Sequence, residues 1–213
     1  MTAIKMQQLK NILENGIEEL GLTPEQVQLD QQLAYIALLE KWNKAFNLTA
    51  IKDPQEMVVL HTMDSLAVYP YIKGETVLDV GTGPGIPGIP LALCFPNIHF
   101  TLLDSNGKKT RFIQQAVIEL GINNVEIENC RIEKLKNEEG FAQITSRAFT
   151  ATQDFVDLVN PYLEPGGEML AMKGQVPDDE LDKIDSHTFD SEVITLRVPN
   201  LEAQRHLVRI TRK

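Results

Sequence analysis

Apolar residues in the first third of the chain recur at the three- and four-residue spacing of amphipathic helices. The first such stripe runs from Met6 to Leu20 and stops at Gly21, a residue type that commonly follows a helix. Thr23-Pro24 then provides an N-cap hydroxyl with proline at the first helical position. A second stripe covers 33–46, and Asp53-Pro54 opens a third, short helix that ends near His61. We predict a helical N-terminal extension over residues 1–73.

The pattern changes after residue 73 to short apolar strands that alternate with helices. The first strand, Thr76-Val77-Leu78-Asp79-Val80, ends at a glycine cluster, which is typical of a buried strand that feeds a turn. Such alternation predicts right-handed crossovers and a mostly parallel sheet. Two strand-like runs at 191–198 and 206–211 have no helix between them and predict an antiparallel hairpin at the sheet edge. The second unit, 74–213, is therefore predicted as a Rossmann-like α/β domain, with strands at 99–104, 125–129, 142–146 and 169–172 and helices at 88–95, 108–120 and 151–163.

The composition places the chain among ordinary globular proteins of the cytoplasm. It has 213 residues, of which 43% are hydrophobic and 23% charged. No apolar run has the length of a membrane span, and the polar N-terminus lacks the apolar core of a signal peptide. The two cysteines, Cys94 and Cys130, fit neither a disulfide framework nor a metal-ligand spacing. We expect a cytoplasmic protein with no metal site and no membrane partner.

The net charge of −10 argues against a nucleic-acid partner until its distribution is considered. Residues 154–192 hold eleven acids and two lysines, a net −9, so the rest of the chain is nearly neutral. One reading is a protein that binds a polyanion on a separate basic face, and the other is charge that only keeps the protein dissolved. The basic residues outside the acidic segment form three groups: Lys41, Lys44 and Lys52; Lys108, Lys109 and Arg111; and Arg197, Arg205, Arg209, Arg212 and Lys213.

The glycine turn after the first strand is the predicted ligand site. In an open parallel sheet the ligand crevice lies outside the carboxyl ends of the strands, where Gly81, Gly83 and Gly85 fall. Glycine allows unusual φ angles and the close approach of a ligand to the backbone. The stretch from Gly83 to Gly88 also satisfies the dinucleotide pattern, with Asp104 at the distance of a ribose-binding acid.

Two features favour S-adenosylmethionine over a dinucleotide. Asp79 stands two residues before Gly81, and its negative charge suits a sulfonium ligand with a free ammonium group and repels a pyrophosphate. Three prolines, Pro84, Pro87 and Pro90, remove backbone N–H donors that a phosphate would need at the helix start. The sequence therefore predicts a methyltransferase that uses S-adenosylmethionine.

Further candidates follow the other strands. Asp104 would take both ribose hydroxyls or, alternatively, cap the following helix. Ile132 and Glu133 are placed to contact the adenine, and Ile86 either lines the same cavity or belongs to the core. Arg147 ends the fourth strand inside the crevice, where a charge without a partner would be costly. We expect it to contact the methionine end of the cofactor or to orient the substrate.

The chain resembles the GidB (RsmG) family of bacterial small-subunit ribosomal RNA methyltransferases from about Leu33 to the C-terminus. The resemblance implies methyl transfer to nitrogen 7 of guanine at nucleotide 527 of 16S rRNA. It also implies cofactor contacts at Gly81, Ile86, Ile132, Glu133 and Arg147. The motifs that carry it are Trp42 to Thr49, His61-Thr62-Met63-Asp64-Ser65, Asp79 to Pro90, Leu103-Asp104-Ser105, Ser146-Arg147-Ala148 and Lys173-Gly174.

This chemistry needs no general base, because nitrogen 7 of guanine loses no proton when it is methylated and orientation is the main requirement. We predict Arg147, Asn47 and Asp64 as the catalytic candidates, with the Asp64 carboxylate stabilising the cationic product ring. Asn43 and Asn47 lie one helical turn apart and would bind a base or cap a neighbouring helix. His61 fits a structural role and a base-contacting role equally well.

Three functions stay open at this point. The first is an RNA methyltransferase, acting as a monomer on 16S rRNA or on the small ribosomal subunit. The second is a small-molecule methyltransferase, which scattered basic residues would favour. The third is a non-catalytic, ribosome-associated RNA-binding module, which a failure to bind S-adenosylmethionine would favour.

Overall fold

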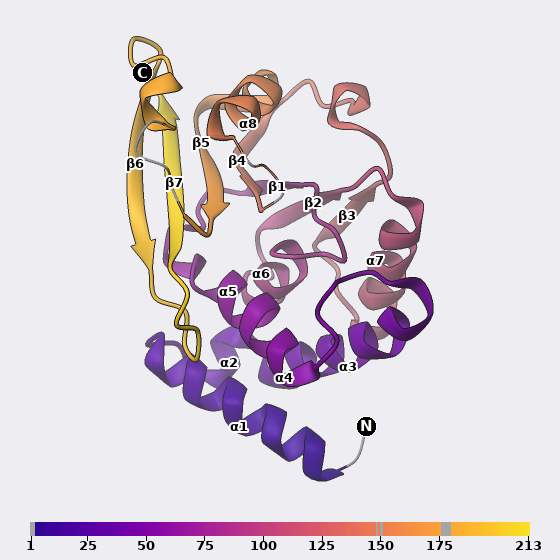
Figure 1. The fold of residues 1–213 in the computed structure, drawn as a ribbon. Helices are drawn as coiled ribbons and strands as arrows, with labels where there is room; N and C mark the ends of the chain where they lie inside the picture. The colour runs from indigo at the N-terminus through magenta and orange to yellow at the C-terminus, as the bar shows by residue number, and fades with distance from the viewer. Residues whose placement is uncertain (1–2, 148, 150, 176–179) are drawn as a thin grey trace.

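A single twisted sheet organises the protein (Figure 1). The computed structural model describes residues 3–147, 149, 151–175 and 180–213, so Ala148, Asp178 and Asp179 lie outside the described residues. Within that part of the chain seven strands form the sheet, in the order β3-β2-β1-β4-β5-β7-β6. The strands are β1 (Thr76–Val80), β2 (His99–Leu103), β3 (Val125–Glu128), β4 (Phe141–Ser146), β5 (Leu163–Lys173), β6 (Phe189–Leu196) and β7 (Arg205–Arg212).

The sheet is parallel from β3 to β5 and antiparallel at its C-terminal end. β6 and β7 form the predicted antiparallel hairpin, and β7 also pairs antiparallel with β5, so the last strand of the chain lies inside the sheet and β6 forms the edge. The chain crosses from the β3 edge back to β4, so the strand order switches between β1 and β4. The predicted Rossmann-like fold, with a mostly parallel sheet and a C-terminal hairpin, is confirmed.

Helices cover both faces of the sheet. The expected helices appear as α6 (Gly88–Cys94), α7 (Gly107–Leu120) and α8 (Thr152–Val159), the last followed by a 3-10 turn, η4 (Asn160–Tyr162). Alternate residues of β1 face opposite cores: Val77 packs in the cluster that contains α6 and α7, and Leu78 in the cluster that contains α8. Asp79 shares the face of Val77 and therefore lies beneath α6.

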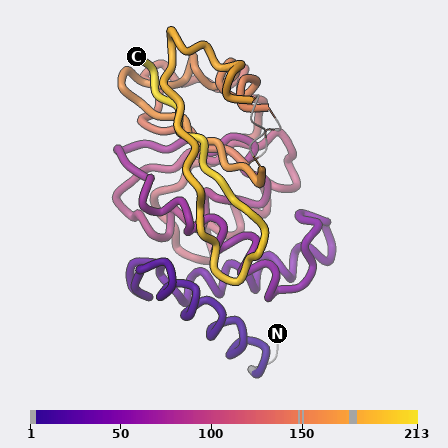
Figure 2. Tube along the Cα trace, turned by 60° about the vertical axis from the view of Figure 1, so that its left-hand side comes forward, coloured from indigo at the N-terminus to yellow at the C-terminus, as the bar shows by residue number. Residues whose placement is uncertain are grey.

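The N-terminal helices pack against the sheet unit rather than apart from it (Figure 2). These are α1 (Ala3–Glu19), α2 (Pro24–Val27) and α3 (Leu29–Phe46), and Thr23 makes the predicted cap on α2. The Trp42 ring of α3 lies edge-on to Phe112 of α7, with centroids 5.8 Å apart. The hydroxyl of Tyr35 donates to the carbonyl of Pro84 in the glycine turn at 2.9 Å. We propose the division into an N-terminal extension, 1–73, and an α/β domain, 74–213. Both segments contribute residues to one apolar cluster.

The third predicted helix, which begins at Pro54, extends beyond His61 to Leu66 and changes from α-helical to π-helical hydrogen bonding along its length. It consists of α4 (Pro54–Met57), a π-helical segment η1 (Val58–Met63) and α5 (Asp64–Leu66). The short 3-10 turns η2 (Tyr69–Tyr71), η3 (Ile132–Lys134) and η5 (Leu181–Lys183) complete the described elements. None of the described helices has both the length and the apolar character needed to cross a membrane.

Candidate functional site

The glycine turn between β1 and α6 leaves its backbone open on one side. Gly81, Gly83 and Gly85 have φ angles of 69°, 63° and 97°, in the left-handed region that other residues rarely adopt. A Cβ at Gly85 would lie 2.6 Å from Cγ1 of Ile89, so packing also requires glycine there. At Gly83 the nearest atom to an added Cβ is Nζ of Lys109 at 3.9 Å. A ligand therefore has room to approach the backbone at Gly83.

Asp79 is a fully buried carboxylate beneath this turn. Its Oδ2 accepts hydrogen bonds from Oγ1 of Thr82 at 2.6 Å and from the backbone N–H of Gly88 at 2.9 Å, while Oδ1 has no partner among the described residues. Burial raises the pKa of Asp79 to about 6, against the lowering effect of these two hydrogen bonds. The first N–H of α6, where a pyrophosphate would bind, is thus already occupied by a carboxylate.

Asp104 closes the crevice at the end of β2. Its Oδ2 accepts from the backbone N–H of Gly83 at 2.9 Å and lies 3.6 Å from Nζ of Lys109, while Oδ1 accepts from the backbone of Asn106 at 2.8 Å. The side chain that caps α7 is Asn106, not Asp104. Asp104 therefore ties the ends of β1 and β2 together beside the open backbone of Gly83. Lys109, counted with the basic residues in the sequence, belongs to this site.

The apolar candidates are buried and Glu133 is exposed. Ile86 and Ile132 are each 3% exposed and pack in opposite core clusters. The carbonyl of Ile132 accepts from the Tyr162 hydroxyl at 2.6 Å, which fixes the 3-10 turn η3 after β3. Glu133 lies on that turn with its side chain in solvent. The three residues thus border the ends of β1 and β3, the edge of the sheet where the glycine turn lies.

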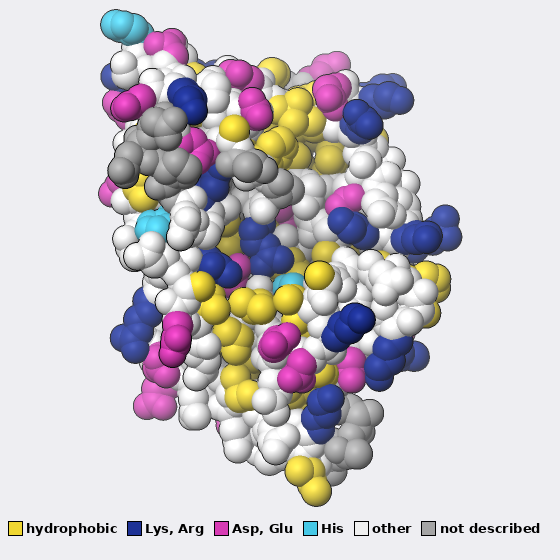
Figure 3. Space-filling view, in the orientation of Figure 1, with side chains coloured by type: hydrophobic (Ala, Val, Ile, Leu, Met, Phe, Trp, Pro, Cys, Tyr) yellow, Lys and Arg dark blue, Asp and Glu magenta, His cyan; other side chains and the backbone are white. Residues whose placement is uncertain are grey.

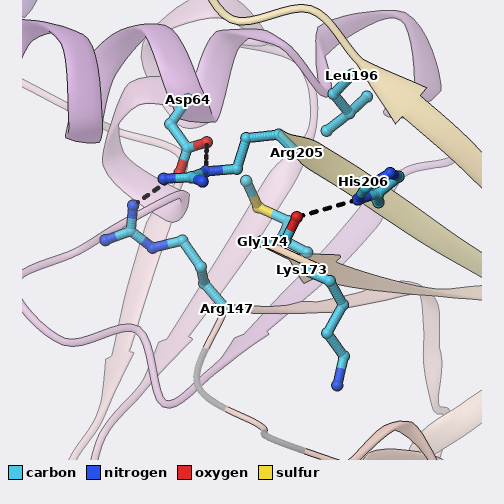
Figure 4. Close-up of a pocket in the computed structure, with 8 residues that line it drawn as sticks. Asp64, Arg147, Lys173, Gly174, Leu196, Arg205 and His206 are labelled. Carbon is cyan, nitrogen blue, oxygen red and sulfur yellow. Dashed lines mark hydrogen bonds and ion pairs between the residues drawn. The ribbon is translucent and has the colours of Figure 1, made fainter. Parts of the chain in front are cut away.

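Arg147 follows β4 and is held by a buried carboxylate, Asp64, which also binds a second arginine (Figure 4). Nη1 of Arg147 donates to Oδ2 of Asp64 at 2.9 Å, and Nε of Arg205 donates to Oδ1 at 3.0 Å. The Asp64 side chain is only 3% exposed, whereas those of Arg147 and Arg205 are 30% and 23% exposed. The charge at Arg147 is thus paired, as expected. Arg205 was counted only as part of a basic cluster, and no local sequence signal marks it.

The π-helical segment supplies a second anchor for Arg147. In an α-helix the N–H of Asp64 would bond to the carbonyl of Leu60. Here it bonds to the carbonyls of Val59 and His61 instead. The Leu60 carbonyl accepts from Nη1 of Arg147 at 2.8 Å. One irregular turn therefore provides both the carbonyl and the carboxylate that fix this guanidinium, in agreement with the frequent occurrence of π-turns at functional sites.

The asparagine candidates lie at the end of α3. Asn47 is the C-cap residue, with φ of 52°, and its exposed side chain lines a hollow with Asn43, Lys44 and Lys52. The Asn43 side chain is buried and bridges the backbone of Thr49 and Ile51 at 2.9 Å each. Asn43 is therefore a structural brace for the loop after α3. Asn47 is not among the residues that line the hollow beside Arg147 and Asp64.

His61 is buried against the same loop. Its Nε2 lies 3.1 Å from Oγ1 of Thr49, and its Nδ1 has no partner among the described residues. Burial, with Arg147 nearby, lowers the pKa of His61 to about 4, so the ring is neutral at pH 7. A histidine with so low a pKa is a weak proton acceptor at that pH.

The basic groups differ in how far acids within the chain neutralise them. Three of the four C-terminal arginines pair with acids: Arg197 with Glu19 at 2.9 Å, Arg209 with Glu192 at 2.5 Å and Arg205 with Asp64. Arg212 donates to Asn160 instead. In the described chain no ion pair forms at Lys41, Lys52, Lys108 or Arg111, which belong to α3, α7 and the loop after α3. Helices α3 and α7 pack together on one side of the molecule. Lys and Arg side chains are prominent over that side in Figure 3.

The crevice fits S-adenosylmethionine better than a phosphate-bearing cofactor. Oδ1 of Asp79 is a buried acceptor without a partner among the described residues, and the backbone at Gly83 is open to a ligand. Asp104 keeps lone pairs for the two hydroxyls of a ribose. A pyrophosphate would instead meet two buried carboxylates and an α6 N-terminus that already has its acceptor.

Comparison with known proteins gives the same result. The family model GidB, described as rRNA small subunit methyltransferase G, matches residues 28–208. A relative of the same description from Vibrio vulnificus is 46% identical over 209 residues, which cover 98% of this chain and 99% of the relative. One from Ectopseudomonas mendocina is 48% identical over 199 residues, 92% and 93% of the two chains. Among solved structures, a putative O-methyltransferase from Klebsiella pneumoniae matches with a TM-score of 0.58 at 11% identity, covering 84% of this chain and 90% of that one. This last likeness concerns the fold.

Proposed function

The chain belongs to the GidB family of rRNA small subunit methyltransferases, and from this premise we propose that it methylates nitrogen 7 of guanine at nucleotide 527 of 16S rRNA. S-adenosylmethionine is its cofactor. Held by Asp79, Asp104 and the glycine turn, it would supply a methyl group to the lone pair of nitrogen 7. The products are S-adenosylhomocysteine and a cationic 7-methylguanine. We place the reaction in the cytoplasm, on the small subunit or its RNA, with the protein acting as a monomer.

The observation that carries this proposal is the lack of a suitable base among the described residues at the end of β4. Arg147 is a cation there, and both oxygens of Asp64 accept from arginines. The pKa of His61, lowered to about 4 by burial, makes that ring a poor proton acceptor at pH 7. Methylation at guanine nitrogen 7 removes no proton, so such a site suits it.

We assign the roles of the site residues on this basis. Asp79 binds the cofactor's ammonium group, and Asp104 binds the ribose. The backbone from Gly81 to Gly85 leaves space for the cofactor, and the adenine side is lined by Ile86, Ile132 and Glu133. Arg147 orients the guanine by donating to its O6 atom, next to the reacting nitrogen. Asp64 acts as a positioning residue through Arg147, because its oxygens are taken. Asn47 contacts RNA at the end of α3.

The test is to map the modified nucleotide. Small subunits from cells that lack the gene are incubated with the protein and methyl-labelled cofactor, and the rRNA is cleaved chemically at 7-methylguanine. We expect one cleavage site, at nucleotide 527, which depends on the protein. A labelled small molecule without labelled RNA, or a methyl group at another position or atom, would contradict the proposal.

Cofactor binding should strengthen as the pH rises through about 6. The pKa of Asp79 is raised by burial from 3.8 to about 6, and the ammonium group favours the ionised carboxylate. Calorimetry in buffers of different ionisation enthalpy should show proton release on S-adenosylhomocysteine binding near pH 5.5. The Asp79→Asn variant should bind more weakly at pH 7.5 and lose the proton release. An unchanged pH profile in this variant would exclude the assigned role.

The raised pKa of Asp79 also makes the free energy of unfolding depend on pH. Because the folded-state pKa exceeds the unfolded one, the folded chain binds more protons between about pH 3.8 and 6. The Asp79 contribution to the free energy of unfolding of the unliganded protein therefore falls as the pH rises across this window. The difference in unfolding free energy between wild type and Asp79→Asn should follow that trend.

Neutralising Lys108 should weaken binding to the small subunit. Lys108 is exposed at the start of α7 and forms no ion pair within the described chain, so its charge is available to RNA phosphates. Arg209 is the matched control, since its charge is balanced by Glu192. We expect Lys108→Gln to lower the affinity and the steepness of its salt dependence, and Arg209→Gln to leave both nearly unchanged. Equal effects of the two variants would show that RNA binding does not distinguish the unpaired Lys108 from the acid-paired Arg209.

A further inference from the structure

A hollow of about 290 Å³ lies beside the crevice, on the far side of Arg147 from the glycine turn. Its walls come from the carboxyl ends of β4 and β5 and from the start of β7 (Figure 4). The residues that line it are Asp64, Arg147, Met172, Lys173, Gly174, Leu196, Arg205 and His206. Its lining begins at Arg147, directly after β4, and extends past the end of β5 to the start of β7, away from β1 in the sheet order.

The hollow presents two arginine side chains at fixed positions. Asp64 holds both guanidinium groups from behind, and Arg205 also donates from Nη1 to the carbonyl of Gln204 at 2.9 Å. Nη2 of each arginine has no partner among the described residues, and the two side chains keep 30% and 23% of their surface exposed. Two donors are thus oriented by one buried carboxylate and remain open to a ligand.

The local charge suits a singly charged anion. Arg147 and Arg205 contribute two positive charges and Asp64 one negative charge. Lys173 is paired with Glu180 at 2.7 Å and adds no net charge. The balance of one positive charge matches a phosphodiester group, and the arginine fork matches its pair of oxygens.

We propose that this hollow binds a backbone phosphate of the RNA adjacent to the target nucleotide, with Arg205 as its principal ligand and Asp64 as the positioning residue. The proposal rests on the proposed function, because the phosphate belongs to the RNA substrate. It assigns Arg205 to substrate binding, separate from the cofactor, and it gives the β6–β7 hairpin a part in RNA recognition. The phosphate contact would fix the register of the RNA strand while Arg147 reads the base.

The experiment measures binding of wild type and variants to small subunits that lack the modification, across a salt series. Arg205→Gln should lower the affinity at least tenfold and reduce the slope of log affinity against log salt by about 0.7 to 0.9, the value for one phosphate. Arg212→Gln, at the opposite end of β7, is the matched control and should leave the slope unchanged. S-adenosylhomocysteine affinity should be the same in all three proteins.

Arg205→Gln also removes one of the two hydrogen-bond partners of Asp64. A second pair of variants, at His206, leaves the Asp64 contacts in place. His206 lies on the wall, with its Nδ1 3.0 Å from the carbonyl of Gly174. His206→Glu places a negative charge in the hollow and should weaken subunit binding more strongly than the neutral replacement His206→Gln. Thermal melts identify any variant that fails to fold. If Arg205→Gln is such a variant, the comparison of the two His206 variants tests whether the hollow binds an anion.

Other outcomes would overturn the proposal. If Arg205→Gln keeps the wild-type salt slope, no phosphate binds there, although wild-type methylation at nucleotide 527 would still support the proposed function. If Arg205→Gln instead loses affinity for S-adenosylhomocysteine, and not for its decarboxylated analogue, the anion is the cofactor's carboxylate. If His206→Glu and His206→Gln bind subunits equally well, the hollow faces no anion.

Discussion

Replacing Arg147 with lysine should lower methyl transfer about 100-fold while leaving the fold intact. Lysine keeps the charge near Asp64, but a single ammonium group cannot hold the Leu60 carbonyl, the Asp64 carboxylate and a guanine at once, as the planar guanidinium can. Arg147→Ala should be less active still. It should also lower the free energy of unfolding by about 1–3 kcal/mol, because a buried carboxylate loses one of its two partners.

The measurement is single-turnover methyl transfer to small subunits, run beside chemical denaturation of each variant. Asp64→Asn is the companion variant, since it keeps the side-chain shape and weakens the hold on both arginines. With small subunits at saturating concentration, so that a weaker hold on Arg205 does not limit binding, we expect it to reduce transfer with Arg147 present and to have little further effect in an Arg147→Ala background. Full activity of Arg147→Ala, or additive losses in the double variant, would refute the coupling between these residues.

The Gly83→Val substitution should abolish measurable cofactor binding, with an affinity loss of more than about 100-fold. The valine side chain would fill the space beside the glycine turn that we assign to the ligand, since no protein atom lies within 3.4 Å of an added Cβ. The backbone cost alone is about 1–2 kcal/mol, because φ is 63°.

Gly121 is the matched control for this backbone cost. Its φ is 64°, and nothing lies within 4 Å of an added Cβ, at a helix end away from the crevice. Gly121→Val should lose similar stability and retain full affinity for S-adenosylhomocysteine by calorimetry. Similar affinity losses in both variants would show that strain, not occupied space, explains the effect.

Most of the fold followed from local patterns in the sequence. The order of strands and helices from Thr76 to Lys173 appears as predicted, because each segment carries its own apolar period. The predicted bounds are wrong at one place: the helix expected over 151–163 ends at Val159, and the strand expected over 169–172 begins at Leu163. The position of β7 between β5 and β6 depends on pairing between distant segments, and no local pattern encodes it. The π-helical turn at Val58–Met63 was also missed, since its sequence has the apolar spacing of an ordinary helix.

The candidate site was predictable where one short motif builds it. Asp79 and the glycines act within a few residues of one another, so their spacing in the sequence already implies their arrangement. The Asp64–Arg205 pair joins residues 141 positions apart, and the bond from Arg147 to Leu60 spans 87 positions. Charge counting placed Arg205 in a surface cluster, because a sequence does not show which cations acquire a buried partner.

The interior position of β7 also governs when the sheet becomes complete during synthesis. Residues 205–212 are made after the six other strands of the sheet, yet they fill the place between β5 and β6. Until they emerge, β5 has an open edge that offers unpaired backbone groups to other chains. The pairing of β7 is non-local, which is slow compared with local helix formation. A chain truncated before Arg205 would therefore expose an aggregation-prone edge, and the nascent protein gains its second arginine only after the six other strands have been made.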